Sequence, residues 1–160
     1  MNVFLLLTAL RDLLKQEAGH LLLPSRSRGD DREFVKRAPH VFIGALPPDM
    51  SDNLEAVPFV LIQAMQGHQS AEDGMHLARI CFRLAVQDED PEGAENHLHN
   101  LLSLIMGCVM RAGRNGAGGG RYVMWPGEQG RLWFWQRPDE QLPPFAEAYA
   151  VTTWAMKGIE

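Results

Sequence analysis

The chain has 160 residues, of which 46% are hydrophobic and 22% are charged, and its formal net charge is -5. This length and hydrophobic content suffice to bury one core, so we expect a single domain over residues 1–160 rather than two domains. The negative charge argues against a dedicated nucleic-acid binder, because phosphate recognition normally needs a basic surface. With Cys81 and Cys108 as its only cysteines, the chain has no disulfide framework and no paired-cysteine metal or redox motif.

The first apolar segment predicts a helix that ends near Gly19. Apolar residues recur there at three- and four-residue spacing: Val3, Leu6, Leu7, Leu10, Leu13 and Leu14. The segment is too short for a membrane span, and no basic region precedes it as in a signal peptide. We therefore expect a core helix, in a protein that is made and acts in the cytoplasm of its host cell.

Residues 24–38 are rich in charge and almost free of apolar periodicity. This composition predicts an exposed arm or loop. Its basic residues are mixed with Asp30, Asp31 and Glu33. That mixture favours a solvated or intersubunit salt-bridging surface over a phosphate site.

Three strands are expected next, at residues 40–45, 58–66 and 75–87. The second is apolar on both faces, which predicts a central position, and the turn-prone residues 67–74 lead from it into the third as a hairpin. In the third strand, apolar residues alternate with Arg79, Cys81 and Arg83. This period of two predicts a half-buried strand.

An acidic turn joins the third strand to a long helix. Residues 87–93 read QDEDPEG, which offers Asp90 as the N-cap, Pro91 at the first helical position and carboxylates where the helix dipole favours them. Apolar residues then follow a helical stripe that ends at Gly113: Leu98, Leu101, Leu102, Ile105 and Val109. Strand, turn and helix are expected to form one packed unit.

The last third contains a glycine-rich loop and two further strands. Residues 113–120 follow a helix and precede a strand at 121–125, the reverse of the order around a phosphate-binding loop, so we expect a flexible connector. The aromatic residues between Trp125 and Trp154 are expected in the core or at a subunit interface, since Arg131 and Arg137 alone hardly form the basic groove of a nucleic-acid platform. Residues 145–157 alternate as a final strand, expected to close the sheet.

The sequence predicts no catalytic, metal or cofactor site. His97 and His99 lie two positions apart on the predicted helix and so point in different directions, unlike the pair of a helical zinc site. The acidic residues of the turn match no calcium loop, and no Ser or Cys lies in a recognisable nucleophile elbow. We expect a protein that is not an enzyme and that needs no cofactor.

The order of these features resembles the tail terminator, or tail completion, proteins of long-tailed, non-contractile bacteriophages and related prophages. The resemblance spans residues 1–157 and rests on PFVLI at 58–62, QDEDPEG at 87–93, the helix through 101–106 and YAVTTW at 149–154. Its most specific parts are the acidic junction and the terminal Thr-Thr-Trp strand. Segments 24–37 and 113–120 look like insertions relative to the family pattern.

The resemblance implies an α+β subunit, with a mainly antiparallel sheet of four to five strands and the N-terminal and central helices on one face. It further implies a structural virion protein that forms a six-membered ring, caps the head-proximal end of the tail tube, stops tube polymerisation and presents the joining surface for the head or neck. Its partners would be copies of itself, the tail tube protein and head-completion or neck proteins. The genome would pass through the lumen without specific binding, and no membrane would be involved. The implied location is the virion tail, after assembly in the bacterial cytoplasm.

Interface residues for such assembly would come from the arm, from the polar face of the third strand and from the acidic turn: Arg26, Arg28, Arg32, Arg37, Arg79, Arg83, Asp88, Glu89 and Asp90. For each of them the alternative is a solvated surface charge. Two other functions stay open: a head-tail connector (neck) protein, and a small α+β module that binds nucleic acid or a ligand on an exposed sheet. Salt-dependent retention on nucleic acid would favour the module.

Overall fold

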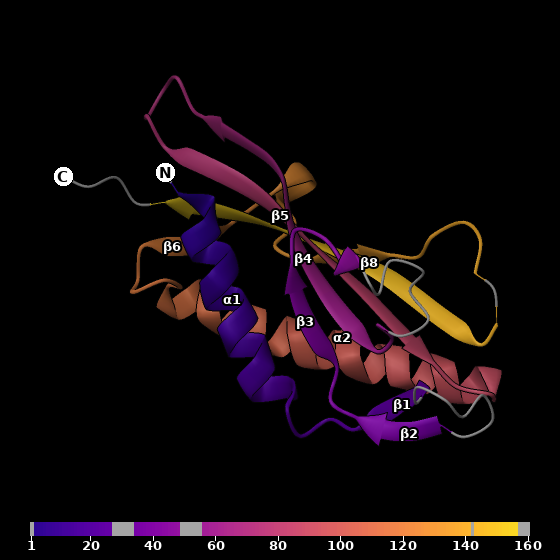
Figure 1. Cartoon of the computed structure of the whole chain (residues 1–160). Coiled ribbons are helices and arrows are strands. Elements are labelled where there is room, and N and C mark those ends of the chain that lie inside the picture. The colour runs from indigo at the N-terminus through magenta and orange to yellow at the C-terminus, as the bar shows by residue number, and fades with distance from the viewer. Residues whose placement is uncertain (1, 27–33, 49–55, 142, 157–160) are drawn as a thin grey trace.

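The computed structural model describes residues 2–26, 34–48, 56–141 and 143–156. Its α-helices are α1 (Val3–Ala18) and α2 (Pro91–Asn115), and Glu128–Gly130 forms a short 3-10 helix, η2. Its strands are β1 (Leu23–Arg26), β2 (Phe34–Arg37), β3 (His40–Ile43), β4 (Phe59–Gln69), β5 (His76–Gln87), β6 (Tyr122–Trp125), β7 (Phe134–Gln136) and β8 (Phe145–Met156). The expected α+β class is confirmed, with more strands than predicted: a six-stranded sheet in the order β3-β4-β5-β8-β6, with β7 beside β8, and a separate pair β1-β2 (Figure 1).

The central strand of the large sheet is β5. It pairs antiparallel with β4, as the predicted hairpin, and antiparallel with β8 along its whole length. Ile80, Phe82 and Leu84 are fully buried on the face that carries the helices, while Arg79 and Arg83 lie on the opposite face. The alternation predicted for this strand from the sequence therefore matches the two faces of the sheet.

Both helices pack on the same face of the sheet. The side-chain oxygen of Asn2 caps α1 by accepting from the Phe4 amide at 3.1 Å. The hydroxyl of Tyr122 in β6 donates to the Asn2 carbonyl at 2.7 Å, which ties the start of α1 to the far margin of the sheet. Buried apolar residues of both helices join one core with the sheet: Leu6, Leu10, Leu14, Leu98, Leu101, Ile105 and Val109.

The last strand, β8, does not close the sheet, so that part of the sequence prediction is wrong. It lies inside, between β5 on one side and β6 and β7 on the other. Tyr122 of β6 is opposite Met156, and Phe134 of β7 is opposite Val151. β7 could not be predicted from the sequence, because three residues give too few alternations to reveal a period of two.

The segment expected to be an exposed arm is partly a small sheet. Its described ends pair antiparallel, with Leu23 opposite Arg37 and Arg26 opposite Phe34. Leu23 and Ser25 are buried, which the high charge of the segment concealed. Residues 27–33, including Arg28 and Arg32, lie outside the described residues.

The glycine-rich loop starts later than predicted, because α2 continues to Asn115. Gly113 is buried inside the helix against β6, where an added Cβ would lie 2.6 Å from the Met124 Cβ. The backbones of Ala117 and Tyr122 then exchange hydrogen bonds in both directions. Instead of an open connector, residues 117–122 form a tight turn into β6.

We expect Phe82→Ala to lower the free energy of unfolding by about 3–5 kcal/mol, because it leaves a cavity beneath the helices. Equilibrium urea denaturation measures the loss. Met65→Ala is the control on the neighbouring strand: Met65 is 61% exposed, and its truncation should change stability by less than about 0.5 kcal/mol. Equal losses in both variants would contradict the assignment of the core face.

Candidate interaction surface

Half of the sheet face opposite the helices is covered. Near the end of β5 that leads into α2, a second small core forms from Ala56, Val57, Phe59, Leu61 and Ala85. The guanidinium of Arg83 lies beside it, with Nη2 3.3 Å from Glu147 Oε1 and its carbon 5.5 Å from the centroid of the Phe59 ring. Arg83 therefore makes intramolecular contacts that close this half of the face.

The other half of this face is an open groove of about 300 Å³. Gln66 and His68 of β4 line one side, and Phe134 lines the other together with residues of the 126–131 segment. Arg79 reaches from the floor to Glu128, with Nη1 3.6 Å from Oε1. The groove thus combines an apolar wall with one ion pair that is open to solvent.

Cys81 lies on β5 between Arg79 and Arg83 and is 8% exposed. Burial raises the pKa of its thiol, and the positive charges of Arg79 and Arg83 act in the opposite direction. Since burial is the larger effect, the thiol stays protonated and weakly nucleophilic at neutral pH.

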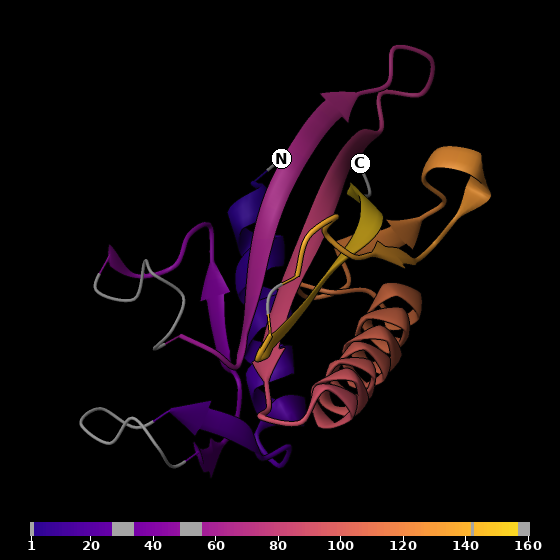
Figure 2. The same cartoon turned by 90° about the vertical axis from the view of Figure 1, so that its right-hand side faces the viewer.

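The turn of the β4-β5 hairpin projects beyond the sheet (Figures 1 and 2), whereas Gln69 and His76 at its base lie in one row with Met156 of β8. Strand β3 ends beside Ile62, so among the described residues no strand pairs with the outer edge of β4 over residues 63–69. The turn predicted at 67–74 is shorter than expected, because β4 runs to Gln69 and β5 starts at His76. Most of this stretch is exposed on both faces, so it lacks the alternation that reveals a strand.

A bulge and a capped turn shape the outer part of the hairpin. Ala64 is opposite Ile80 and Gln66 is opposite Arg79, which leaves Met65 as the extra residue of a β-bulge. At the tip, Asp73 Oδ1 accepts a hydrogen bond from the Met75 amide at 2.9 Å, and this bond lowers the pKa of the Asp73 carboxyl. The neighbouring carboxylate, Glu72, is exposed.

The acidic junction between β5 and α2 is held by its own carboxylates. Asp90 is the N-cap, as predicted, and accepts from the Glu92 amide at 3.3 Å. Asp88 accepts from the Asp90 amide at 3.0 Å and lies 2.9 Å from His97 Nε2. A Cβ at Gly93 would lie 2.6 Å from Asp88 Oδ2, so only glycine leaves room for this arrangement.

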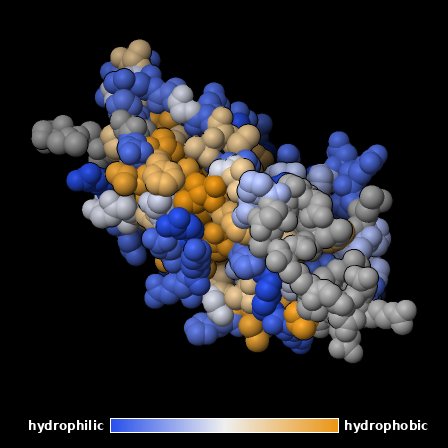
Figure 3. Space-filling view, viewed as in Figure 1, coloured by the Kyte–Doolittle hydropathy of each residue, from blue (hydrophilic) through white to orange (hydrophobic). Residues whose placement is uncertain are grey.

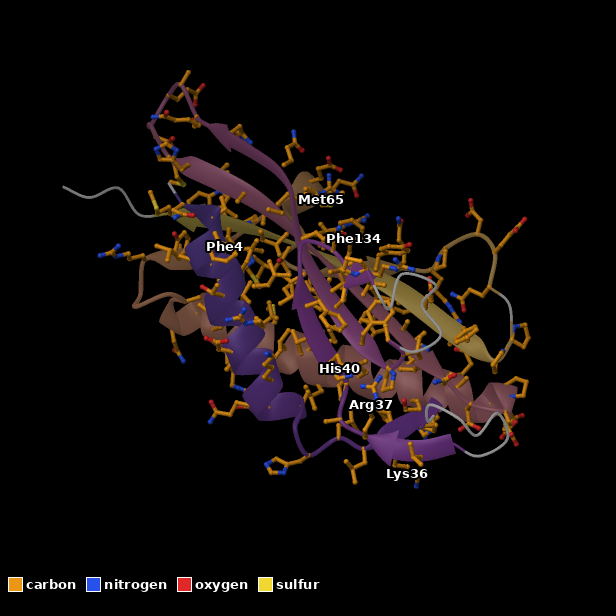
Figure 4. All side chains as sticks on the ribbon, viewed as in Figure 1. Phe4, Lys36, Arg37, His40, Met65 and Phe134 are labelled. Carbon is orange, nitrogen blue, oxygen red and sulfur yellow. The ribbon has the colours of Figure 1, made fainter. Side chains whose placement is uncertain are left out.

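Arg37 holds the small β1-β2 sheet against the start of β4. Its guanidinium donates to Ser25 Oγ at 2.9 Å and to the carbonyls of Ala56 at 2.9 Å, Ala38 at 3.1 Å and Pro58 at 3.2 Å. Burial lowers the pKa of Arg37, which still leaves it protonated at neutral pH. Lys36 lies on the outer side of the same strand, as Figure 4 shows.

The interface residues predicted from the sequence do not form one patch. Arg37 and the acidic turn lie at the end of the sheet where α2 begins, and both regions contact the 56–58 segment. Arg79 lies at the other end, beside the hairpin, with Arg83 between the two ends on the same strand. Glu89 is exposed at the turn, and Arg26 belongs to β1.

The groove and the free edge of the hairpin could not be predicted from the sequence. Both depend on where β3 stops and on how the 126–134 segment folds back, and neither property leaves a local pattern. The described residues place no three His, Cys, Asp or Glu side chains together as a metal site, and neither helix is both long and apolar enough to cross a membrane. Compared with known proteins, the chain matches no protein-family model and no curated protein.

We expect Asp90→Ala to destabilise the protein by about 1 kcal/mol, because the first turn of α2 loses its cap. Glu89→Ala is the matched control one residue earlier, since Glu89 is exposed and should contribute less than about 0.5 kcal/mol. Thermal unfolding followed by circular dichroism compares the two variants. A loss that is as large for Glu89→Ala as for Asp90→Ala would speak against the capping role.

We expect Arg37→Met to destabilise by about 2–3 kcal/mol, because it leaves buried backbone carbonyls without their charged donor. Lys36→Met, on the outer side of the same strand, should change stability by less than about 0.5 kcal/mol. Urea denaturation gives the two values. If Arg37→Met behaves like Lys36→Met, the carbonyl contacts of Arg37 do not hold the small sheet in place.

Proposed function

We propose that the chain is a structural subunit of a tailed bacteriophage or prophage particle. In this role it caps the head-proximal end of the tail tube, stops tube polymerisation and provides the surface that the head or neck joins. The resemblance of the sequence to tail terminator proteins supports the proposal. The α+β architecture that this resemblance implies, with two helices on one face of the sheet, agrees with the fold.

The observation that carries the proposal is how the segments behind the resemblance pack together. The 58–62 segment enters β4 and the 149–154 segment lies in β8, and these two strands flank β5. The acidic turn leads directly from β5 into α2. Within β8, Trp154 is fully buried and its indole donates to the buried Thr152 Oγ at 2.9 Å, whereas Thr153 between them lines the groove.

The surface offers separate regions for several protein contacts, as a capping subunit requires. A tube of identical rings presents an open end, and growth stops when a different subunit covers that end without offering a new site for another ring. On the helix side, Phe4 is 57% and Leu5 is 48% exposed at the start of α1, and hydrophobic atoms gather over this region in Figure 3. The groove lies on the opposite face of the sheet, and the turn of the hairpin projects from the end of the sheet at which α1 starts (Figure 2).

Disruption of the gene in a phage or prophage that encodes this chain tests the proposal. We expect negative-stain electron microscopy to show overlong tubes without heads, because nothing stops tube growth. A plasmid copy of the wild-type gene should restore the normal tube length. The Glu140→Ala variant, which changes only an exposed side chain, serves as a second complementing copy that reports on expression and folding.

Two other results of the gene disruption would contradict the proposal. Tubes of normal length that fail to join heads would indicate a connector at the neck. Unaltered virions would remove the role in tail assembly altogether. Salt-dependent binding of the purified protein to nucleic acid would then favour a binding module.

A further inference from the structure

The two margins of the sheet are open to strand pairing at the same level, except at Tyr122, whose backbone amide and carbonyl bond to Ala117. Beyond the end of β3 the sheet is four strands wide, with β4 at one margin and β6 at the other. One row of paired residues runs from Gln69 through His76 and Met156 to Tyr122. Within the described residues, the outer edge of β4 pairs with no strand here, and that of β6 makes only the bridge between Ala117 and Tyr122.

These two edge strands run in opposite directions, because each of the three pairings between them is antiparallel. In a ring, all subunits share one orientation, so the β4 edge of one copy would meet the β6 edge of the next as an antiparallel pair. Free strand edges are ready templates for such strand addition. The shared row of residues and the opposite directions of β4 and β6 therefore both fit a head-to-tail contact between copies.

The charges at the two margins are complementary. Residues 38–78 contain no Lys or Arg, and the hairpin tip carries Glu72 and Asp73. Residues 96–127 contain no Asp or Glu, and Arg114 and Arg121 are exposed next to β6. Opposite potentials attract the two different edges, and like charges disfavour two identical edges.

Each margin also exposes a side chain of a type that is enriched in protein interfaces. Trp125 at the end of β6 is 39% exposed, and Met65 at the bulge of β4 is 61% exposed. Tryptophan and methionine supply apolar area at the centre of such contacts. The two edges thus offer apolar area beside their charges.

We propose that the outer part of β4, residues 63–69, and its acidic tip bind the β6 edge of a second copy of this chain, with Glu72 facing Arg121. Repetition of the contact joins the copies edge to edge into a closed ring. The inference rests on the proposed function, because it assigns the contact through which the ring of the capping subunit closes.

A charge-exchange experiment on the full-length protein tests this contact. Glu72→Lys and Arg121→Glu should each weaken self-association by about tenfold or more in sedimentation velocity, because each places like charges together. An equimolar mixture of the two variants should associate as the wild type does, because every contact between alternating copies is again complementary. Glu140→Lys reverses an exposed charge elsewhere and should have no effect.

Recovery in the mixture also shows that both variants are folded. The inference is overturned if the wild type stays monomeric at every concentration, if single variants associate normally, or if the mixture fails to recover. Tube capping separates this inference from the function on which it rests. If the single variants still cap tubes fully, the proposed contact is wrong but the capping function stands. If the single variants and their mixture associate as expected but the wild type does not cap tubes, the capping function is wrong but the contact stands.

Discussion

The structure depends on the burial of one strand between two others. β5 pairs with β4 on one side and with β8 on the other, and Ile80, Phe82 and Leu84 on its inner face are fully buried beneath both helices. Because side chains alternate between faces, this burial also fixes the outer face, where Arg79 and Arg83 must lie. The register of β5 with its neighbours therefore determines which side chains form the covered half and the open groove of the outer face.

Polar contacts then fix how the peripheral parts attach to this core. At the end of the sheet where α2 begins, carboxylates satisfy the free amides of the first helical turn, and Arg37 satisfies carbonyls near the start of β4. These groups are charged, yet their partners lie within the same chain. Formal charge in a sequence thus says little about whether a residue is available to a partner: Asp88 and Arg37 are engaged, whereas Glu72 and Arg121 are exposed.

Much of the fold could be predicted from the sequence, because the central elements are long and periodic. α1, β5 and the N-cap of α2 follow directly from apolar spacing and from Asp90 and Pro91. β7 and the β1-β2 pair could not be predicted, since short strands stabilised by distant contacts, such as those of Arg37, carry no period of their own. The candidate surface was harder to predict: the periodicity of β5 places Arg79 on the outer face, but the free edge of β4 depends on where β3 ends.

The bulge at Met65 has a consequence for solubility. A free strand edge invites indiscriminate pairing and aggregation, and proteins protect such edges with bulges, charged side chains and proline. Residues 63–69 of β4 contain a bulge, Gly67, three glutamines and no β-branched residue, a composition with low tendency to join foreign strands. The same irregularity that interrupts the ladder thus protects this edge from indiscriminate pairing, and leaves shape and charge, rather than generic strand affinity, to select a binding partner.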